Sequence, residues 1–162
     1  MKKILSFVVA FFMFGIASSY AQSVEYQGEV DLGYSFGIGD FGIDRINLHT
    51  VQGAKIGDHF SLGAGLGVDW YYNEYGSDIM LPIYLNAKGY LPVSDKFSPF
   101  ASLDLGYGVG VTTNASGFYW SPSIGIKYSK LKVQIGYVSQ SLSDSGVSVS
   151  MSAFQFKVGL VF

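Results

Sequence analysis

The sequence of residues 151–162, Met-Ser-Ala-Phe-Gln-Phe-Lys-Val-Gly-Leu-Val-Phe, alternates between two kinds of side chain. Successive side chains of an extended strand point to opposite faces. One face is then wholly apolar and carries Phe154, Phe156, Val158, Leu160 and Phe162. The other face carries Ala153, Gln155, Lys157, Gly159 and Val161. An aromatic face backed by small and polar residues predicts a strand with hydrocarbon outside and a polar interior.

The same alternation recurs along the chain between turn signals, and no sustained helical period interrupts it. Eight strands are predicted, at residues 24–37, 43–56, 59–72, 79–91, 97–111, 117–129, 131–141 and 151–162. Each span reaches the ~9–11 residues that a tilted strand needs to cross a bilayer. The pattern predicts an all-β fold, an eight-stranded antiparallel up-and-down transmembrane β-barrel.

The alternating final strand that ends on Phe162 resembles the small outer-membrane β-barrels of Gram-negative bacteria, the porin family that includes outer membrane protein A-like and X-like barrels. The resemblance implies residence in the outer membrane, surrounded by its lipid, as a monomer. It also implies that Phe162 is an assembly signal. Barrel-assembly machinery and periplasmic chaperones are then the expected partners during biogenesis.

The N-terminal segment, residues 1–21, has the features of a secretory signal peptide. Two lysines precede an apolar run from Ile4 to Ile16, and small residues before Ala21 form a cleavage site. The run is too short for a spanning helix, although a retained N-terminal anchor is an alternative. Residues 22–162 then form one barrel domain. The sequence has no Cys, which excludes disulfides, and its 12 acidic against 10 basic residues do not suggest a nucleic-acid partner.

The predicted connections alternate in character. Those at Gly57-Asp58, 92–96 and Ser129-Lys130 are tight or contain Pro, whereas those at 38–42, 73–78, 112–116 and 142–150 are longer and more polar. Short turns at one end and longer loops at the other match the periplasmic and extracellular ends of an outer-membrane barrel. The longer loops could bind an extracellular partner or simply be solvated.

The polar face of the predicted strands is expected to line the lumen. Its charged residues and one histidine form a candidate lumen network: Glu29, Asp31, Arg45, His49, Lys55, Asp69, Lys88, Asp104, Lys127 and Lys157. Glycines at 63, 65 and 67, and again at 106, 108 and 110, share this face. A soluble lipocalin-like barrel would turn the apolar face inward, but glycines suit the crowded interior of an eight-stranded barrel.

Register counting predicts specific neighbours inside the lumen. A first hairpin centred on Asp40 places Asp31 opposite His49, Ser35 opposite Arg45 and Glu25 opposite Lys55. The same counting places Arg45 diagonal to Asp69 and Asp104 diagonal to Lys127. Inward lysines fall on the even-numbered strands and inward acids on the odd-numbered ones, so neighbouring strands offer opposite charges.

Catalytic, cofactor and metal sites are not predicted. The Gly-rich stretches at 63–67 and 106–110 lie inside strands, without the helix that a phosphate loop needs, and two distant histidines do not make a metal site. His49 beside a carboxylate is half of a hydrolytic triad, but no Ser has a motif of its own. We expect a non-enzymatic structural or surface-interaction protein with a side-chain-plugged lumen. A narrow porin-like channel and a lipid-modifying outer-membrane enzyme are the alternatives.

Overall fold

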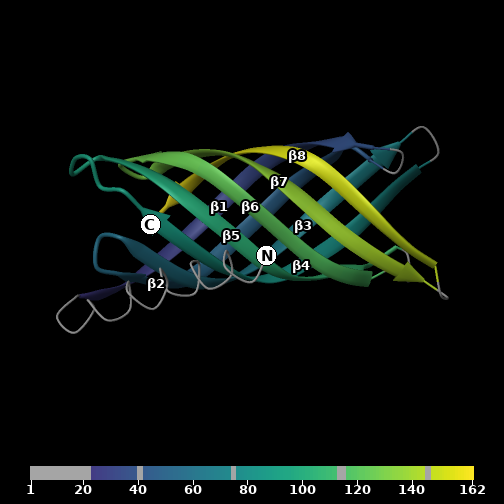
Figure 1. The fold of residues 1–162 in the computed structure, drawn as a ribbon, viewed down its shortest axis with the longest axis horizontal. Helices are drawn as coiled ribbons and strands as arrows, with labels where there is room; N and C mark the ends of the chain where they lie inside the picture. The colour runs from purple at the N-terminus through teal and green to yellow at the C-terminus, as the bar shows by residue number, and fades with distance from the viewer. Residues whose placement is uncertain (1–22, 40–41, 74–75, 113–115, 145–146) are drawn as a thin grey trace, which may run out of the picture.

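A computed structural model describes residues 23–162, apart from 40–41, 74–75, 113–115 and 145–146 (Figure 1). The predicted signal peptide at residues 1–21 therefore lies outside the described residues, as do parts of the four predicted loops. Among the described residues, no helix is long and apolar enough to cross a membrane.

Within the described residues the chain forms eight strands that close into a barrel in sequence order. They are β1 (Val24–Ile38), β2 (Arg45–Ile56), β3 (Phe60–Asn73), β4 (Gly76–Tyr90), β5 (Phe97–Gly110), β6 (Ser116–Tyr128), β7 (Leu131–Asp144) and β8 (Val147–Val161). Every neighbouring pair is antiparallel, including the β1–β8 pair that closes the barrel. The predicted fold class is confirmed.

The two ends of the barrel carry different connections. The turn end carries the β2–β3, β4–β5 and β6–β7 connections together with the start of β1 and the end of β8, and the loop end carries the other connections (Figure 1). Phe162 lies at the turn end, where its backbone N–H and C=O bond to Gly28 at 2.9 and 2.7 Å. These two bonds extend the seam between β8 and β1.

At the loop end, three strands run at least three residues further than the sequence predicted. β4 begins at Gly76, β7 ends at Asp144 and β8 begins at Val147, so the loops predicted at 73–78 and 142–150 are largely strand. Backbone pairing continues there, as the Asn73–Gly76 and Asp144–Val147 pairs show. The prediction ended each strand where the apolar alternation ended, but ladder hydrogen bonds do not require apolar side chains.

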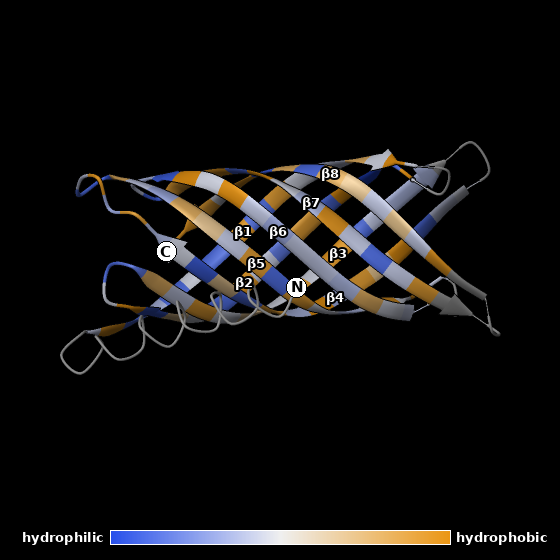
Figure 2. Ribbon diagram, in the orientation of Figure 1, coloured by the Kyte–Doolittle hydropathy of each residue, from blue (hydrophilic) through white to orange (hydrophobic). Residues whose placement is uncertain are grey.

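The apolar face points outward around the barrel. Large side chains at mid-strand positions are exposed, including Leu32 at 61%, Leu85 at 71% and Ile124 at 61%. Figure 2 shows the corresponding orange bands on strands that otherwise alternate with blue and white. The predicted facing is confirmed, and the lipocalin-like arrangement with the apolar face inward is wrong.

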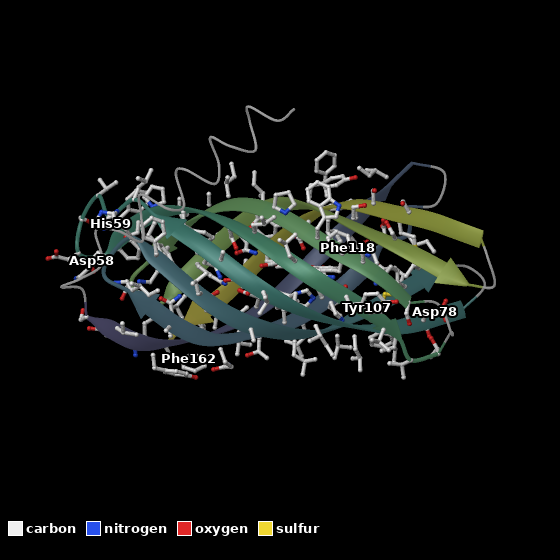
Figure 3. All side chains as sticks on the ribbon, turned by 60° about the horizontal axis from the view of Figure 1, so that its bottom comes forward. Asp58, His59, Asp78, Tyr107, Phe118 and Phe162 are labelled. Atoms are coloured by element: carbon white, nitrogen blue, oxygen red, sulfur yellow. The ribbon has the colours of Figure 1, made fainter. Side chains whose placement is uncertain are left out.

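Aromatic residues lie on the outer face near both ends. Towards the loop end, the hydroxyls of Tyr34 and Tyr72 lie 2.5 Å apart, and Tyr107 pairs with Phe118 across β5 and β6. Figure 3 shows Tyr107 and Phe118 on the outer surface near Asp78, and Phe162 towards the opposite end. Such rings suit the interfaces between hydrocarbon and water.

Inward glycines make room for large side chains in the lumen. A Cβ atom on Gly65 would meet the ring of Tyr84, and one on Gly67 would meet the ring of His49. A Cβ on Gly159 would likewise collide with the carboxylate of Asp31. The predicted role of the glycine face is therefore confirmed at these positions.

Candidate functional site: the charged lumen

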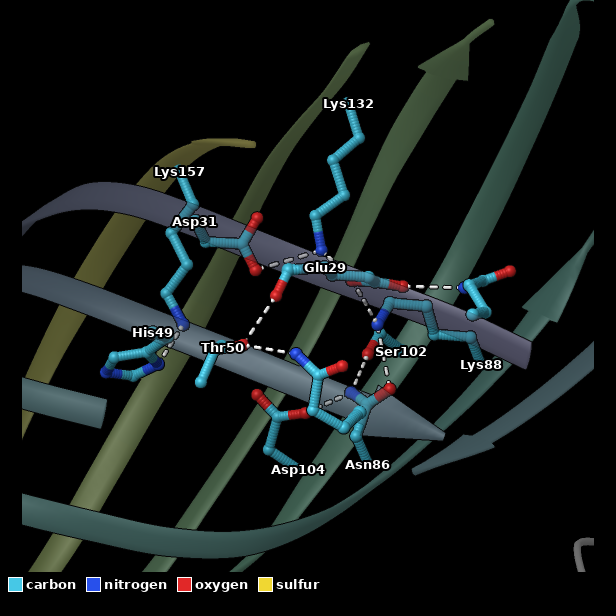
Figure 4. Close-up of polar contacts among 12 residues, drawn as sticks. Glu29, Asp31, His49, Thr50, Asn86, Lys88, Ser102, Asp104, Lys132 and Lys157 are labelled. Carbon is cyan, nitrogen blue, oxygen red and sulfur yellow. Dashed lines mark hydrogen bonds and ion pairs between the residues drawn. The ribbon is translucent and has the colours of Figure 1, made fainter. Parts of the chain in front are cut away.

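The turn-side half of the lumen centres on Glu29 of β1. Lys88 from β4 donates to its carboxylate at 2.9 Å, and Lys132 from β7 donates to the same oxygen (Figure 4). Lys132 also forms an ion pair with Asp31 at 2.9 Å. All four side chains are buried, with exposures of 4% or less. Residues from three separated strands therefore meet across the bore.

A second cluster surrounds Asp69 of β3. The side-chain amide of Asn47 donates to its carboxylate at 2.6 Å, and the guanidinium of Arg45 lies 3.9 Å away. The predicted diagonal placement of Arg45 and Asp69 is confirmed, because Asp69 pairs with Asn47 two residues along β2. Arg45 also donates to the hydroxyl of Tyr71.

His49 joins this cluster to Lys157. Its Nε2 lies 2.8 Å from Oδ1 of Asp69, and its Nδ1 lies 3.1 Å from the ammonium of Lys157 and 3.2 Å from the hydroxyl of Tyr84. An ammonium can only donate, so Nδ1 accepts and Nε2 carries the proton that Asp69 accepts. Both ring nitrogens are thus engaged. The predicted pairing of Asp31 with His49 across β1 and β2 is confirmed, but the carboxylate that holds the ring belongs to Asp69.

Asp104 does not meet Lys127, and that prediction is wrong. Asp104 pairs with Ser121 and accepts a hydrogen bond from Asn86, whereas Lys127 pairs with Ser98. The prediction placed the centre of the β5–β6 hairpin too close to the C-terminus. A shift of that centre by one residue changes the predicted partner of each residue by two positions. Lys127 is half-buried at the turn end, 6.0 Å from the centre of the Tyr90 ring.

Lys55 also lies at the turn end and outside the central network. It pairs with Asp58 at 2.9 Å, and the Asp58 side chain is 76% exposed. Hydrogen bonding from Lys55 lowers the pKa of the Asp58 carboxyl below its ordinary value. The predicted backbone pairs Glu25–Lys55 and Ser35–Arg45 are confirmed.

The sequence interpretation missed Lys132, which contacts both Glu29 and Asp31. It lies on β7 and shares its face with Gln134, so period-two alternation alone would have found it. Its position on an odd-numbered strand also contradicts the rule that inward lysines occupy even-numbered strands. Inward tyrosines were missed as well, namely Tyr71, Tyr84, Tyr90 and Tyr119.

Two solved structures have a similar shape. Neisserial surface protein A (NspA) matches with a TM-score of 0.65 and 11% identity, over 86% of this chain and 97% of that one. The outer membrane enzyme PagL matches with a TM-score of 0.62 and 10% identity, over 81% of this chain and 97% of that one. The fold is that of a small outer-membrane β-barrel. No family model matches the sequence, and the search of curated proteins found no match.

Within this outer-membrane barrel fold, the buried charges of the described residues balance. The buried acids are Glu29, Asp31, Asp69 and Asp104, and the buried bases are Arg45, Lys88, Lys132 and Lys157. Enclosed charges are tolerated when they are paired and hydrogen-bonded, and equal numbers allow that. Among the described residues, no three His, Asp or Glu side chains are grouped as metal ligands would be.

Proposed function

We propose that this chain is an integral outer-membrane barrel with a non-enzymatic structural or surface-interaction role, whose lumen is closed by its own side chains. The observation that carries the proposal is the charge-balanced network of buried side chains that crosses the bore from β1 to β4 and β7. An eight-stranded barrel is only just wide enough for side chains to fill. Long inward lysines and tyrosines therefore leave little room for an ion pathway.

Support for membrane insertion comes from the outer face. Exposed large apolar side chains occur on all eight described strands, from Leu32 on β1 to Leu160 on β8. Burial of apolar surface gains roughly 25 cal/mol per Å² removed from water, so this face is favourable in hydrocarbon and unfavourable in water. Outer-membrane lipid is then the partner around the barrel, and the assembly machinery and periplasmic chaperones act during biogenesis.

Support for a non-enzymatic role comes from His49. A general base needs a ring nitrogen that can accept a proton from a nucleophile that is open to substrate. In the described structure the two nitrogens of His49 contact Asp69, Lys157 and Tyr84, and the ring is buried in the lumen. PagL, an outer membrane enzyme, shares the fold at 10% identity, but a fold alone does not carry a function. The exposed loop end is the surface left for a partner.

The test is to reconstitute the purified protein into liposomes and planar bilayers. Flotation with the liposomes establishes insertion, and we then expect no stable pore-sized conductance. The double variant Glu29→Ala with Lys132→Ala shortens two central side chains, and ion flux through it would show that the assay detects an opened lumen. A stable conductance in the unmutated protein would establish the narrow-channel alternative. Time-dependent release of fatty acid from added outer-membrane lipid would establish the enzyme alternative.

A further inference from the structure

The outer face carries an apolar groove at the turn end, with a volume of about 750 Å³. Its floor is made by two small outward residues, Gly89 on β4 and Ala101 on β5, which pair directly. A Cβ atom added to Gly89 would meet nothing within 4 Å. Leu91, Pro99 and Ile126 form its walls. The groove therefore exists because two neighbouring positions on the apolar outer face, Gly89 and Ala101, lack bulky side chains.

The groove continues past the ends of the strands. Leu91, which lines it, is 68% exposed, and Val93 in the same β4–β5 connection is 69% exposed. Polar residues are the usual choice for a short turn in water, so apolar residues here extend the lipid-facing surface beyond the strand ends. His59 lines the groove from the β2–β3 turn. Figure 3 shows His59 and Asp58 together at this end of the barrel.

Basic residues lie in the connections at the same end of the barrel. The backbone N–H of Ser129 donates to the carbonyl of Lys96 at 2.7 Å, which places the β4–β5 and β6–β7 connections side by side. Lys96 and Lys130 in these connections are both exposed. Asp58 is already paired with Lys55 at 2.9 Å. Asp95 is the acidic residue nearest to Lys96 in the sequence. An apolar groove that ends at basic and imidazole groups matches an acyl chain joined to a phosphate.

We propose that this groove binds one phospholipid of the leaflet at the turn end. The acyl chain lies over Gly89 and Ala101, and the phosphate lies beside Lys96, Lys130 and His59. The inference rests on the membrane placement proposed above, and it adds a specific lipid site to it. Binding is favourable because the acyl chain fills the groove with van der Waals contacts and each nearby lysine attracts the anionic headgroup.

The experiment uses protein refolded from urea, free of native lipid, in detergent. Phosphatidylglycerol, diacylglycerol or inorganic phosphate is added, and native mass spectrometry counts the bound molecules. We expect the unmutated barrel to retain one phosphatidylglycerol and Ala101→Phe, which fills the groove, to lose it. Ala64→Phe is the matched control, because Ala64 is exposed on β3 away from the groove, and it should retain the lipid. Circular dichroism confirms that each variant is folded.

A second arm tests the headgroup. The variant with Lys96→Gln and Lys130→Gln should bind phosphatidylglycerol and diacylglycerol equally, whereas the unmutated barrel should prefer phosphatidylglycerol. Equal lipid retention by Ala101→Phe and Ala64→Phe would overturn the proposal. Displacement of the lipid by inorganic phosphate alone would overturn it in favour of a free-anion site. A dimer that only Ala101→Phe dissociates would overturn it in favour of a second copy of the chain. Failure to insert into liposomes would reject the proposed function, whereas insertion without lipid retention rejects this site alone.

Discussion

Nε2 of His49 lies 2.8 Å from Oδ1 of Asp69, although the residue directly opposite His49 on β1 is Asp31. Gly67 faces His49 across β2 and β3, and its missing side chain leaves space for the imidazole to lie over β3. Asp31 is instead paired with Lys132 from β7. Inside this barrel the partner of a charged group is decided by which long side chains reach across the bore, and backbone register decides only which side chains are candidates.

Removing the central acid should destabilise the barrel strongly. Glu29→Ala leaves Lys88 and Lys132 without the carboxylate that both contact, and loss of one partner of a buried ion pair costs ~3–5 kcal/mol. Reversible urea unfolding in detergent micelles measures the change. Lys55→Ala is the control, because it removes an ion pair with the largely exposed Asp58 and should change stability far less. Equal losses for the two variants would mean that water fills the lumen.

Overpacking beside His49 should also destabilise the barrel. Gly67→Ala places a Cβ against the imidazole ring, which is rigid and held on both sides, at a cost of ~1–3 kcal/mol. Gly89→Ala adds the same atom to a strand position where the space outside is open, and it should change stability little. The same unfolding assay compares the pair. A milder effect at Gly67 than at Gly89 would contradict the inward facing of Gly67.

A charge on the outer face should cost more at mid-strand than at the rim. Ile83 lies in the middle of β4 and is 56% exposed, so Ile83→Arg should cost ~2–4 kcal/mol in a lipid bilayer. Val93→Arg lies in the β4–β5 connection and should cost ~0–1 kcal/mol. Unfolding from liposomes gives both values. Equal losses of stability for the two variants would mean that Ile83 does not lie in the hydrocarbon core of the bilayer.

The orientation can be tested with single cysteines, because the sequence contains none. Ser77→Cys at the loop end should react with a membrane-impermeant maleimide on intact cells, and Ser77 is exposed on β4. Lys130→Cys lies in the β6–β7 turn and should react only after the outer membrane is broken. Labelled protein is counted after purification. Reaction of Lys130→Cys alone on intact cells would reverse the assigned ends.

Period-two alternation is a local property, and for that reason the strands, their facing and the barrel class could be predicted from the residues alone. Phe154 and Gln155, for example, must point in opposite directions in any extended strand. The register of the first hairpin was also predicted correctly, because the hairpin centre inferred from the sequence reproduces the observed Asp31–His49 pair. The strand ends at Gly76 and Val147 were not, since backbone pairing continues after the apolar signal stops.

Only the tertiary structure decided which charges meet in the lumen. Glu29 and Lys132 are 103 residues apart, and closure of β1 against β8 brings them into the same bore. A lysine side chain is long enough to reach acids on several strands, so alternation identifies Lys132 as inward without naming its partners. The predicted contact between Asp104 and Lys127 was wrong, because a small error in the position of one hairpin centre moved the predicted partner by several residues. The amino-acid pattern thus determined the wall of the barrel, and three-dimensional closure determined what fills it.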